Sequence, residues 1–173
     1  ESVAQVRQVG DKFRLAEGLN TLGLVRREQG DYPRARAVLE ETLALAQEAG
    51  DKFSAAFAQS NLGIMAWYQA DYERAEALFK HSLNVRMELG EKRGIATSLV
   101  GLAVVAGAQG QVERAALLFG AAEAMREAIR VPLPPFIRND YERYVTATRT
   151  ALGEERFVET WAKGQTVALD EAI

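Results

Sequence analysis

The feature that most constrains this chain is a repeat every 40 residues. Gly10-Asp11-Lys12-Phe13 recurs as Gly50-Asp51-Lys52-Phe53 and, weakened, as Gly90-Glu91-Lys92. Further landmarks keep this register without an insertion: Leu22-Gly23, Leu62-Gly63 and Leu102-Ala103, then Arg34-Ala35, Arg74-Ala75 and Arg114-Ala115. Because repeat units of this length bury their apolar faces against one another, we expect a stack of similar units.

Each unit has the pattern of two helices joined by a turn. The expected first helices cover residues 12–29, 52–69 and 92–109, and the expected second helices cover 33–49, 73–89 and 112–130. Asp31 and Asp71 can accept backbone N–H groups at a helix start, and Gly50 and Gly90 suit a left-handed residue at a helix end.

The apolar spacing and the composition both favour helix. One stripe is apolar in the second helices: Ala35, Val38, Leu39 and Leu43, then Ala75, Leu78, Phe79 and Leu83. Alanine and leucine dominate and only 4 residues are proline. Gly23 and Gly63 fall opposite small Ala35 and Ala75, so we expect paired helices to approach closely and a large side chain at Gly63 to overpack.

These residues resemble the tetratricopeptide repeat family, whose pattern is W-x2-L-G-x2-Y followed by A-x3-F. The matching pairs are Leu22-Gly23 with Ala35-x3-Leu39, Leu62-Gly63 with Ala75-x3-Phe79, and Leu102-Ala103 with Ala115-x3-Phe119. Arg26, Ala66 and Ala106 replace the tyrosine, and the period exceeds the family's usual value of roughly 34 residues. The resemblance implies an all-α fold, a right-handed α-solenoid of antiparallel helix pairs.

We expect the chain to divide into an array and a C-terminal cap. The expected segments are 1–9 as the end of a preceding repeat helix, 10–49, 50–89 and 90–130 as three repeats, 131–135 as a Pro-rich break, and 136–173 as capping helices. Proline disfavours a helical residue before it, so the break ends the third repeat. Because the chain starts inside a helical pattern without Met, we expect a piece of a longer protein.

A second resemblance concerns the C-terminal half. Residues 101–122, the Pro-rich break and Gly153-Glu154-Glu155-Arg156-Phe157 together resemble the C-terminal helical region of bacterial signal-transduction ATPases and LuxR-type transcriptional regulators. In those proteins the nucleotide-driven switch and the DNA-binding domain lie elsewhere. The resemblance implies a sensor or scaffold role and assigns neither an ATP site nor a DNA-reading helix to this chain.

Several kinds of chemistry lack their residue patterns here. A net charge of -3 argues against direct nucleic-acid binding. An apolar run of about 18 residues, which a membrane span needs, is missing. Cysteine is absent, which permits the reducing cytoplasm where we expect the protein. His81 is the only histidine, so we expect no metal site, no cofactor and no catalytic triad, and therefore no enzymatic activity.

The family resemblance places the first helices along a concave face. The residues expected to line this groove and bind a partner are Asn20, Leu24, Arg27, Phe57, Ser60, Ile64, Trp67, Tyr68, Val100 and Val104. Trp67 and Tyr68 have two interpretations. They can anchor a peptide, because aromatic side chains bury much area at little entropic cost, or they can pack against a neighbouring helix.

Three functions fit this sequence. The first is a protein- or peptide-binding scaffold in a larger regulatory protein. The second is self-association as a homodimer, through the groove or through a cap where Phe157 and Trp161 are exposed. The third is a small-molecule sensor with a pocket between the concave face and the cap. The composition of the groove is compatible with all three.

Overall fold

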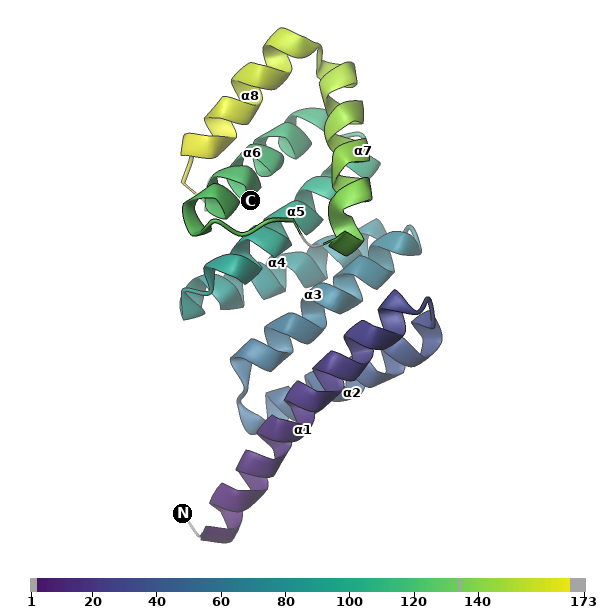
Figure 1. Cartoon of the computed structure of the whole chain (residues 1–173), viewed down its shortest axis with the longest axis vertical. Helices are drawn as coiled ribbons and strands as arrows, with labels where there is room; N and C mark the ends of the chain where they lie inside the picture. The colour runs from purple at the N-terminus through teal and green to yellow at the C-terminus, as the bar shows by residue number, and fades with distance from the viewer. Residues whose placement is uncertain (1–2, 134, 169–173) are drawn as a thin grey trace.

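The computed structural model describes residues 3–133 and 135–168, and within them the chain forms eight helices and no strand. The helices are α1 Val3–Glu28, α2 Tyr32–Ala49, α3 Lys52–Tyr68, α4 Tyr72–Leu89, α5 Lys92–Ala108, α6 Val112–Ile129, α7 Pro135–Leu152 and α8 Glu154–Thr166. Each helix from α1 to α6 packs on the next one along the chain, so that the pairs stack into an elongated array (Figure 1). The expected all-α solenoid is confirmed.

The helices start and stop through the expected turn residues. The carboxylates of Asp31 and Asp71 accept the backbone N–H three residues later, at 3.4 and 3.3 Å. Gly50 and Gly90 end α2 and α4 with φ of 70° and 65°, the left-handed conformation that glycine adopts without strain. Local chemistry therefore sets the two-helix unit before any packing occurs.

The N-terminal helix is longer than the repeat pattern indicates. The sequence placed a boundary near residue 9, whereas α1 runs without a break from Val3 to Glu28. Gly10 lies inside this helix and does not have the positive φ of Gly50 and Gly90. A helix can continue through a glycine at a cost of about 1 kcal/mol relative to alanine, so the residue alone does not impose a turn.

Large side chains inserted against glycines hold the core together. A Cβ on Gly63 would lie 3.2 Å from the ring of Phe79, and one on Gly101 would lie 2.5 Å from the same ring. A Cβ on Gly23 would likewise lie 2.7 Å from the side chain of Leu39. The expected pairing of glycine with small alanines is therefore wrong in detail, because the glycines make room for Leu39 and Phe79, which are almost fully buried.

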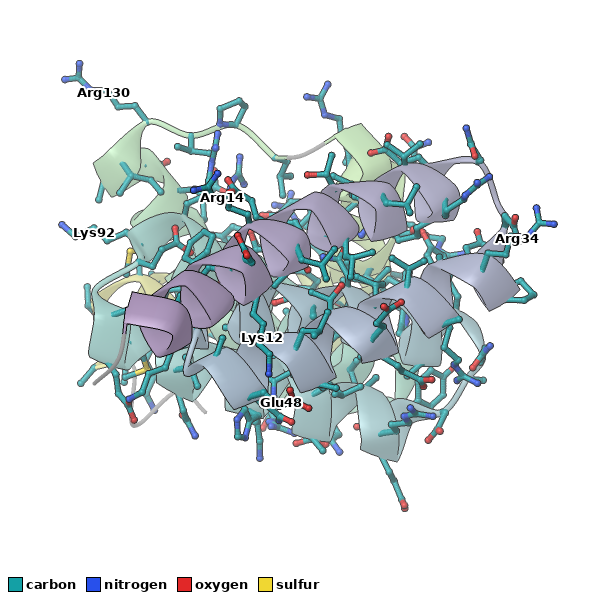
Figure 2. All side chains as sticks on the ribbon, turned by 90° about the horizontal axis from the view of Figure 1, so that it is seen from below. Lys12, Arg14, Arg34, Glu48, Lys92 and Arg130 are labelled. Atoms are coloured by element: carbon teal, nitrogen blue, oxygen red, sulfur yellow. The ribbon has the colours of Figure 1, made fainter. Side chains whose placement is uncertain are left out.

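Ion pairs on the surface repeat with the same period. Lys12 of α1 reaches Glu48 of α2 at 2.7 Å (Figure 2), and Lys52 of α3 reaches Glu88 of α4 at 2.7 Å. Exposed pairs of this kind stabilise a fold by about 0–1 kcal/mol, so they contribute little to stability. Their repetition shows that the two units have the same geometry.

The C-terminal residues do not form a fourth unit of the same kind. After Arg130, residues 131–133 cross in front of α5 and lead to α7, which runs steeply across the array (Figure 1). The ring of Tyr144 on α7 approaches Gly107 of α5 and lies 5.9 Å from the ring of Trp67 on α3. The helix α7 is therefore attached to the ends of α3 and α5.

The helix α8 lies along α6. A Cβ on Gly120 of α6 would collide with the backbone carbonyl of Trp161, and one on Gly164 of α8 would collide with that of Leu117. The ring of Trp161 also stacks on Phe119 at 6.4 Å. Two glycines thus bring the backbones of α6 and α8 together.

Replacing Gly120 with alanine tests this close contact. The obstacle is backbone rather than a flexible side chain, so α8 must separate from α6. We expect Gly120→Ala to lower the free energy of unfolding by about 1–3 kcal/mol, measured by urea denaturation with circular dichroism.

Gly18→Ala is the matched control. A Cβ at Gly18 meets nothing within 4 Å inside a helix, so this change should raise stability by about 0.5–1 kcal/mol. Equal effects of the two substitutions would contradict the close packing of α8 on α6.

Candidate functional site

A cavity of about 490 Å³ opens on the face made by the first helices of the units. Its walls are mainly apolar and come from α1, α3 and α5, with α4, α6, the segment after α6 and the start of α7 completing them. The lining residues are Leu24, Phe53, Phe57, Ser60, Asn61, Ile64, Arg86, Glu91, Arg93, Gly94, Ala96, Thr97, Val100, Arg126, Val131, Pro132, Leu133 and Ile137. The segment 131–133 thus forms part of one wall.

A second cavity of about 350 Å³ continues the first one toward the N-terminus. It is lined by Phe13, Arg14, Glu17, Asn20, Thr21, Leu24, Asp51, Phe53, Ser54 and Phe57. The two cavities share Leu24, Phe53 and Phe57. We call the joined cavities the concave trough. Two neighbouring cavities are suited to an extended ligand, because one side chain of the ligand can enter each cavity.

The polar part of the trough is a buried network around Arg86. Its Nε donates to Ser82 at 3.1 Å, its Nη1 pairs with the Glu91 carboxylate, and Ser82 shares a 2.7 Å hydrogen bond with Ser60. Burial lowers the pKa of Arg86 and the Glu91 carboxylate opposes that shift. Glu91 also accepts the backbone N–H of Gly94, so one carboxylate caps α5 and neutralises Arg86.

Two further arginines lie on the wall of the same cavity. Arg126 occupies on α6 the repeat position that Arg86 occupies on α4, and it pairs with Glu123 at 2.5 Å. The Tyr141 hydroxyl donates to the same carboxylate at 3.2 Å, and burial raises the pKa of this tyrosine. Arg93 is exposed and makes no ion pair among the described residues. This end of the trough therefore offers a cation for a ligand's acidic group.

The structure brings six of the ten predicted site residues to the trough. Leu24, Phe57, Ser60, Ile64 and Val100 line the larger cavity, and Asn20 lines the smaller one. The other four, Arg27, Trp67, Tyr68 and Val104, line neither cavity. Arg27 is buried, where desolvation lowers its pKa, and it donates to Asn61 at 2.5 Å.

The aromatic pair lies under and beside α7. Trp67 is 6% exposed and packs against Tyr68 and Tyr144, with ring centroids 4.5 and 5.9 Å apart. Tyr68 is 48% exposed and its hydroxyl donates to Asp140 of α7 at 2.9 Å. In this structure both side chains contribute to the attachment of α7.

Several lining residues were missed by the sequence reasoning. Phe53 had a usable signal, because Phe13 and Phe53 repeat at the start of two first helices and both are exposed, at 39% and 53%. Arg86 and Arg126 also share a repeat position. The residues of the crossing segment had no signal, because prolines predict where a helix ends and not where the chain goes next.

The cap does not offer the apolar surface that self-association was expected to use. Phe157 is 2% exposed and Trp161 is partly buried against Phe119. On α8 the large hydrophobic side chain that is exposed is Val158. Among residues 3–133 and 135–168, no three His, Asp or Glu side chains converge as a metal ion would require.

Because Tyr68 is bonded to α7 through Asp140, we expect its hydroxyl to ionise at a higher pH than a free tyrosine. Burial, and next the hydrogen bond to Asp140, raise the pKa of Tyr68 to about 12. Stability from this raised pKa is present below about pH 10 and is lost as the pH rises toward 12. We expect absorbance at 295 nm in wild type minus Tyr68→Phe to show an ionisation well above pH 10.

Asp140→Asn should lower that midpoint, because the carboxylate that opposes phenolate formation is gone. A difference titration centred near pH 10 in the wild type would contradict the docked position of α7.

Comparison with known families agrees with the repeat geometry. The family model described as Tetratricopeptide repeat matches residues 14–88 and again residues 54–128, two placements offset by the 40-residue period. No curated protein sequence matches the chain significantly. Over the described residues, none of the helices is both long and apolar enough to cross a bilayer. Since the two matches together span well over half of its length, the chain belongs to the tetratricopeptide repeat family.

Proposed function

We propose that this chain is a protein-binding module whose concave trough takes an extended peptide segment of a partner. Repeats of this family generally mediate protein–protein interaction. The observation that supports the trough is the junction of its two cavities at Leu24, Phe53 and Phe57. A junction with apolar walls can bury a partner's apolar side chain, and such anchors dominate peptide affinity.

The charges of the trough favour one kind of peptide. Arg86 and Arg126 are already paired with Glu91 and Glu123, whereas Arg93 at the rim has no acidic partner among the described residues. The preferred ligand is therefore a segment with an apolar anchor and an acidic residue placed to reach Arg93. A rim pair of this kind contributes little affinity and mainly selects orientation.

The wider role we propose is that of a scaffold or sensor part of a larger bacterial regulatory protein. The support is the resemblance of residues 101–122, the Pro-rich break and residues 153–157 to the C-terminal helical region of signal-transduction ATPases and LuxR-type regulators. In such a protein this module would recruit a partner, while nucleotide and DNA chemistry belong to other domains.

A small-molecule sensor is a second candidate, favoured by the crossing segment. Val131, Pro132 and Leu133 wall one side of a cavity of about 490 Å³, and pockets for small ligands have volumes of about 300–1,000 Å³. A compact ligand would fill this cavity alone, whereas a peptide would also occupy the second cavity.

Two serine substitutions with equal exposure test the peptide function. Phe53 of the trough is 53% exposed and Val158 of α8 is 52% exposed, so neither change should unfold the chain. We expect peptides selected from a random displayed library on the wild type to bind Phe53→Ser about tenfold more weakly and Val158→Ser unchanged. Fluorescence anisotropy with the purified peptides measures both.

The same selection carried out on Arg93→Ser should lose its preference for acidic residues while keeping the apolar anchor. Selected peptides that bind all these proteins equally would contradict the trough as the working surface. If no peptide is selected and a metabolite raises the melting temperature, the small-molecule candidate replaces the peptide one.

A further inference from the structure

The ion pair that repeats along the array is broken in the third unit. In the second unit Lys52, at the start of the first helix, contacts Glu88 of the second helix at 2.7 Å, and the equivalent pair forms in the first unit. Forty residues further on, Lys92 is present but Ala128 takes the place of the glutamate. Lys92 is exposed and makes no ion pair among the described residues. The third unit therefore carries a cation without the partner that the repeat supplies elsewhere.

The residue that ends α6 also departs from the repeat. Arg130 has φ of 54°, at the position where Gly50 and Gly90 end α2 and α4 in the left-handed conformation. Its backbone N–H donates to the Glu127 carbonyl at 3.1 Å, the same bond that Gly90 makes with Met87. The left-handed conformation disfavours a side chain, and the two glycines form the same turn without one. The turn itself therefore does not need an arginine.

Both departures add positive charge at one corner of the array. Lys92 starts α5, Ala128 lies shortly before Arg130 at the end of α6, and both cations point outward on the left of Figure 2. Positions 91–94 and 126–130 hold four basic and two acidic residues, whereas the equivalent positions of each earlier unit hold two of each. This corner thus has a charge of +2 in a chain whose net charge is -3.

The acidic residues of the corner do not neutralise its two exposed cations. Glu91 is already paired with the buried Arg86. Glu127 is exposed and makes no ion pair among the described residues. Lys92 and Arg130 also line neither cavity of the trough, so a ligand in the trough does not need them. The positive charge of the corner is therefore open to an acidic group from outside the chain.

We propose that Lys92 and Arg130 form a docking surface for an acidic segment of a partner protein, separate from the concave trough. A run of aspartate or glutamate residues would supply the carboxylates that Glu48 and Glu88 supply in the earlier units. A nucleic acid fits less well, because two cations neutralise few phosphates and the rest of the chain is net negative. Since exposed ion pairs are individually weak and screened by salt, this contact mainly guides and orients the partner.

Substitutions that restore the repeat test this surface without disturbing the fold. Ala128→Glu rebuilds the ion pair of the earlier units, and Arg130→Gly restores their turn glycine. We expect a hexaglutamate peptide, titrated at about 20 mM salt, to shift the amide NMR signals of residues 91–93 and 127–131 most strongly. Each substitution should weaken this binding about two- to fivefold. The midpoint of urea unfolding should be unchanged or higher, because neither change removes a contact of the core.

Three matched variants separate charge, conformation and location. Arg130→Lys keeps the charge and should bind hexaglutamate as the wild type does. Ala147→Glu adds the same charge as Ala128→Glu at an exposed position of α7, and should have a smaller effect. Phe53→Ser, which should weaken a peptide bound in the trough, should leave hexaglutamate binding unchanged. Failure of the trough function and failure of this surface are therefore distinct results.

The proposal would be overturned by amide shifts centred elsewhere on the chain, or by their absence up to about 10 mM peptide. Hexaglutamate binding that persists in the folded double variant Ala128→Glu/Arg130→Gly, or that falls equally in Ala147→Glu, would also contradict it. An oligothymidylate of equal charge that binds this corner more tightly than hexaglutamate would identify a nucleic-acid backbone as the ligand, and the acidic protein segment would be wrong.

Discussion

A large side chain held between two glycines determines how the units stack. Phe79 projects from α4 toward Gly63 of its own unit and toward Gly101 of the next, so one ring fixes both the pairing within a unit and the step between units. Packing of this density allows little variation in spacing, since an added methyl group at either glycine displaces a buried ring. The smaller Leu39 has the same role one unit earlier, where α3 offers Asn61 in place of the second glycine.

In the third unit the equivalent large side chain is covered by the C-terminal helices, because no fourth repeat follows it among the residues that the structure describes. Phe119 stands where Phe79 stands, but its ring contacts Tyr141 of α7 at 5.1 Å and Trp161 of α8 at 6.4 Å. The C-terminal helices thus supply aromatic surface where a fourth repeat would supply its first helix. Because α8 needs Gly120 to approach α6, its docking depends on a different pair of small residues from those that stack the repeats.

The sequence predicted the parts of the fold that local chemistry decides. The helices expected at 52–69 and 73–89 are Lys52–Tyr68 and Tyr72–Leu89. The carboxylates of Asp51 and Asp71 cap their starts, and left-handed Gly90 ends the second of them. At Gly10 the repeat pattern alone did not indicate that α1 runs through the glycine without a break. The sequence left open whether Trp67 anchors a ligand or packs on a helix, and in the structure it is 6% exposed beside Tyr144 of α7. This contact could not be predicted, because nothing in a Pro-rich break specifies where the chain crosses next.

The course of residues 131–133 therefore links the attachment of α7 to the shape of the trough. The Tyr68–Asp140 hydrogen bond and the Trp67–Tyr144 contact hold α7 against α3, and α7 in turn fixes where the crossing segment ends. Leu133 and Ile137, on either side of that junction, are buried and line the larger cavity. A ligand that fills this cavity contacts the segment directly, so its binding energy acts on the position of α7 as well as on the three repeats.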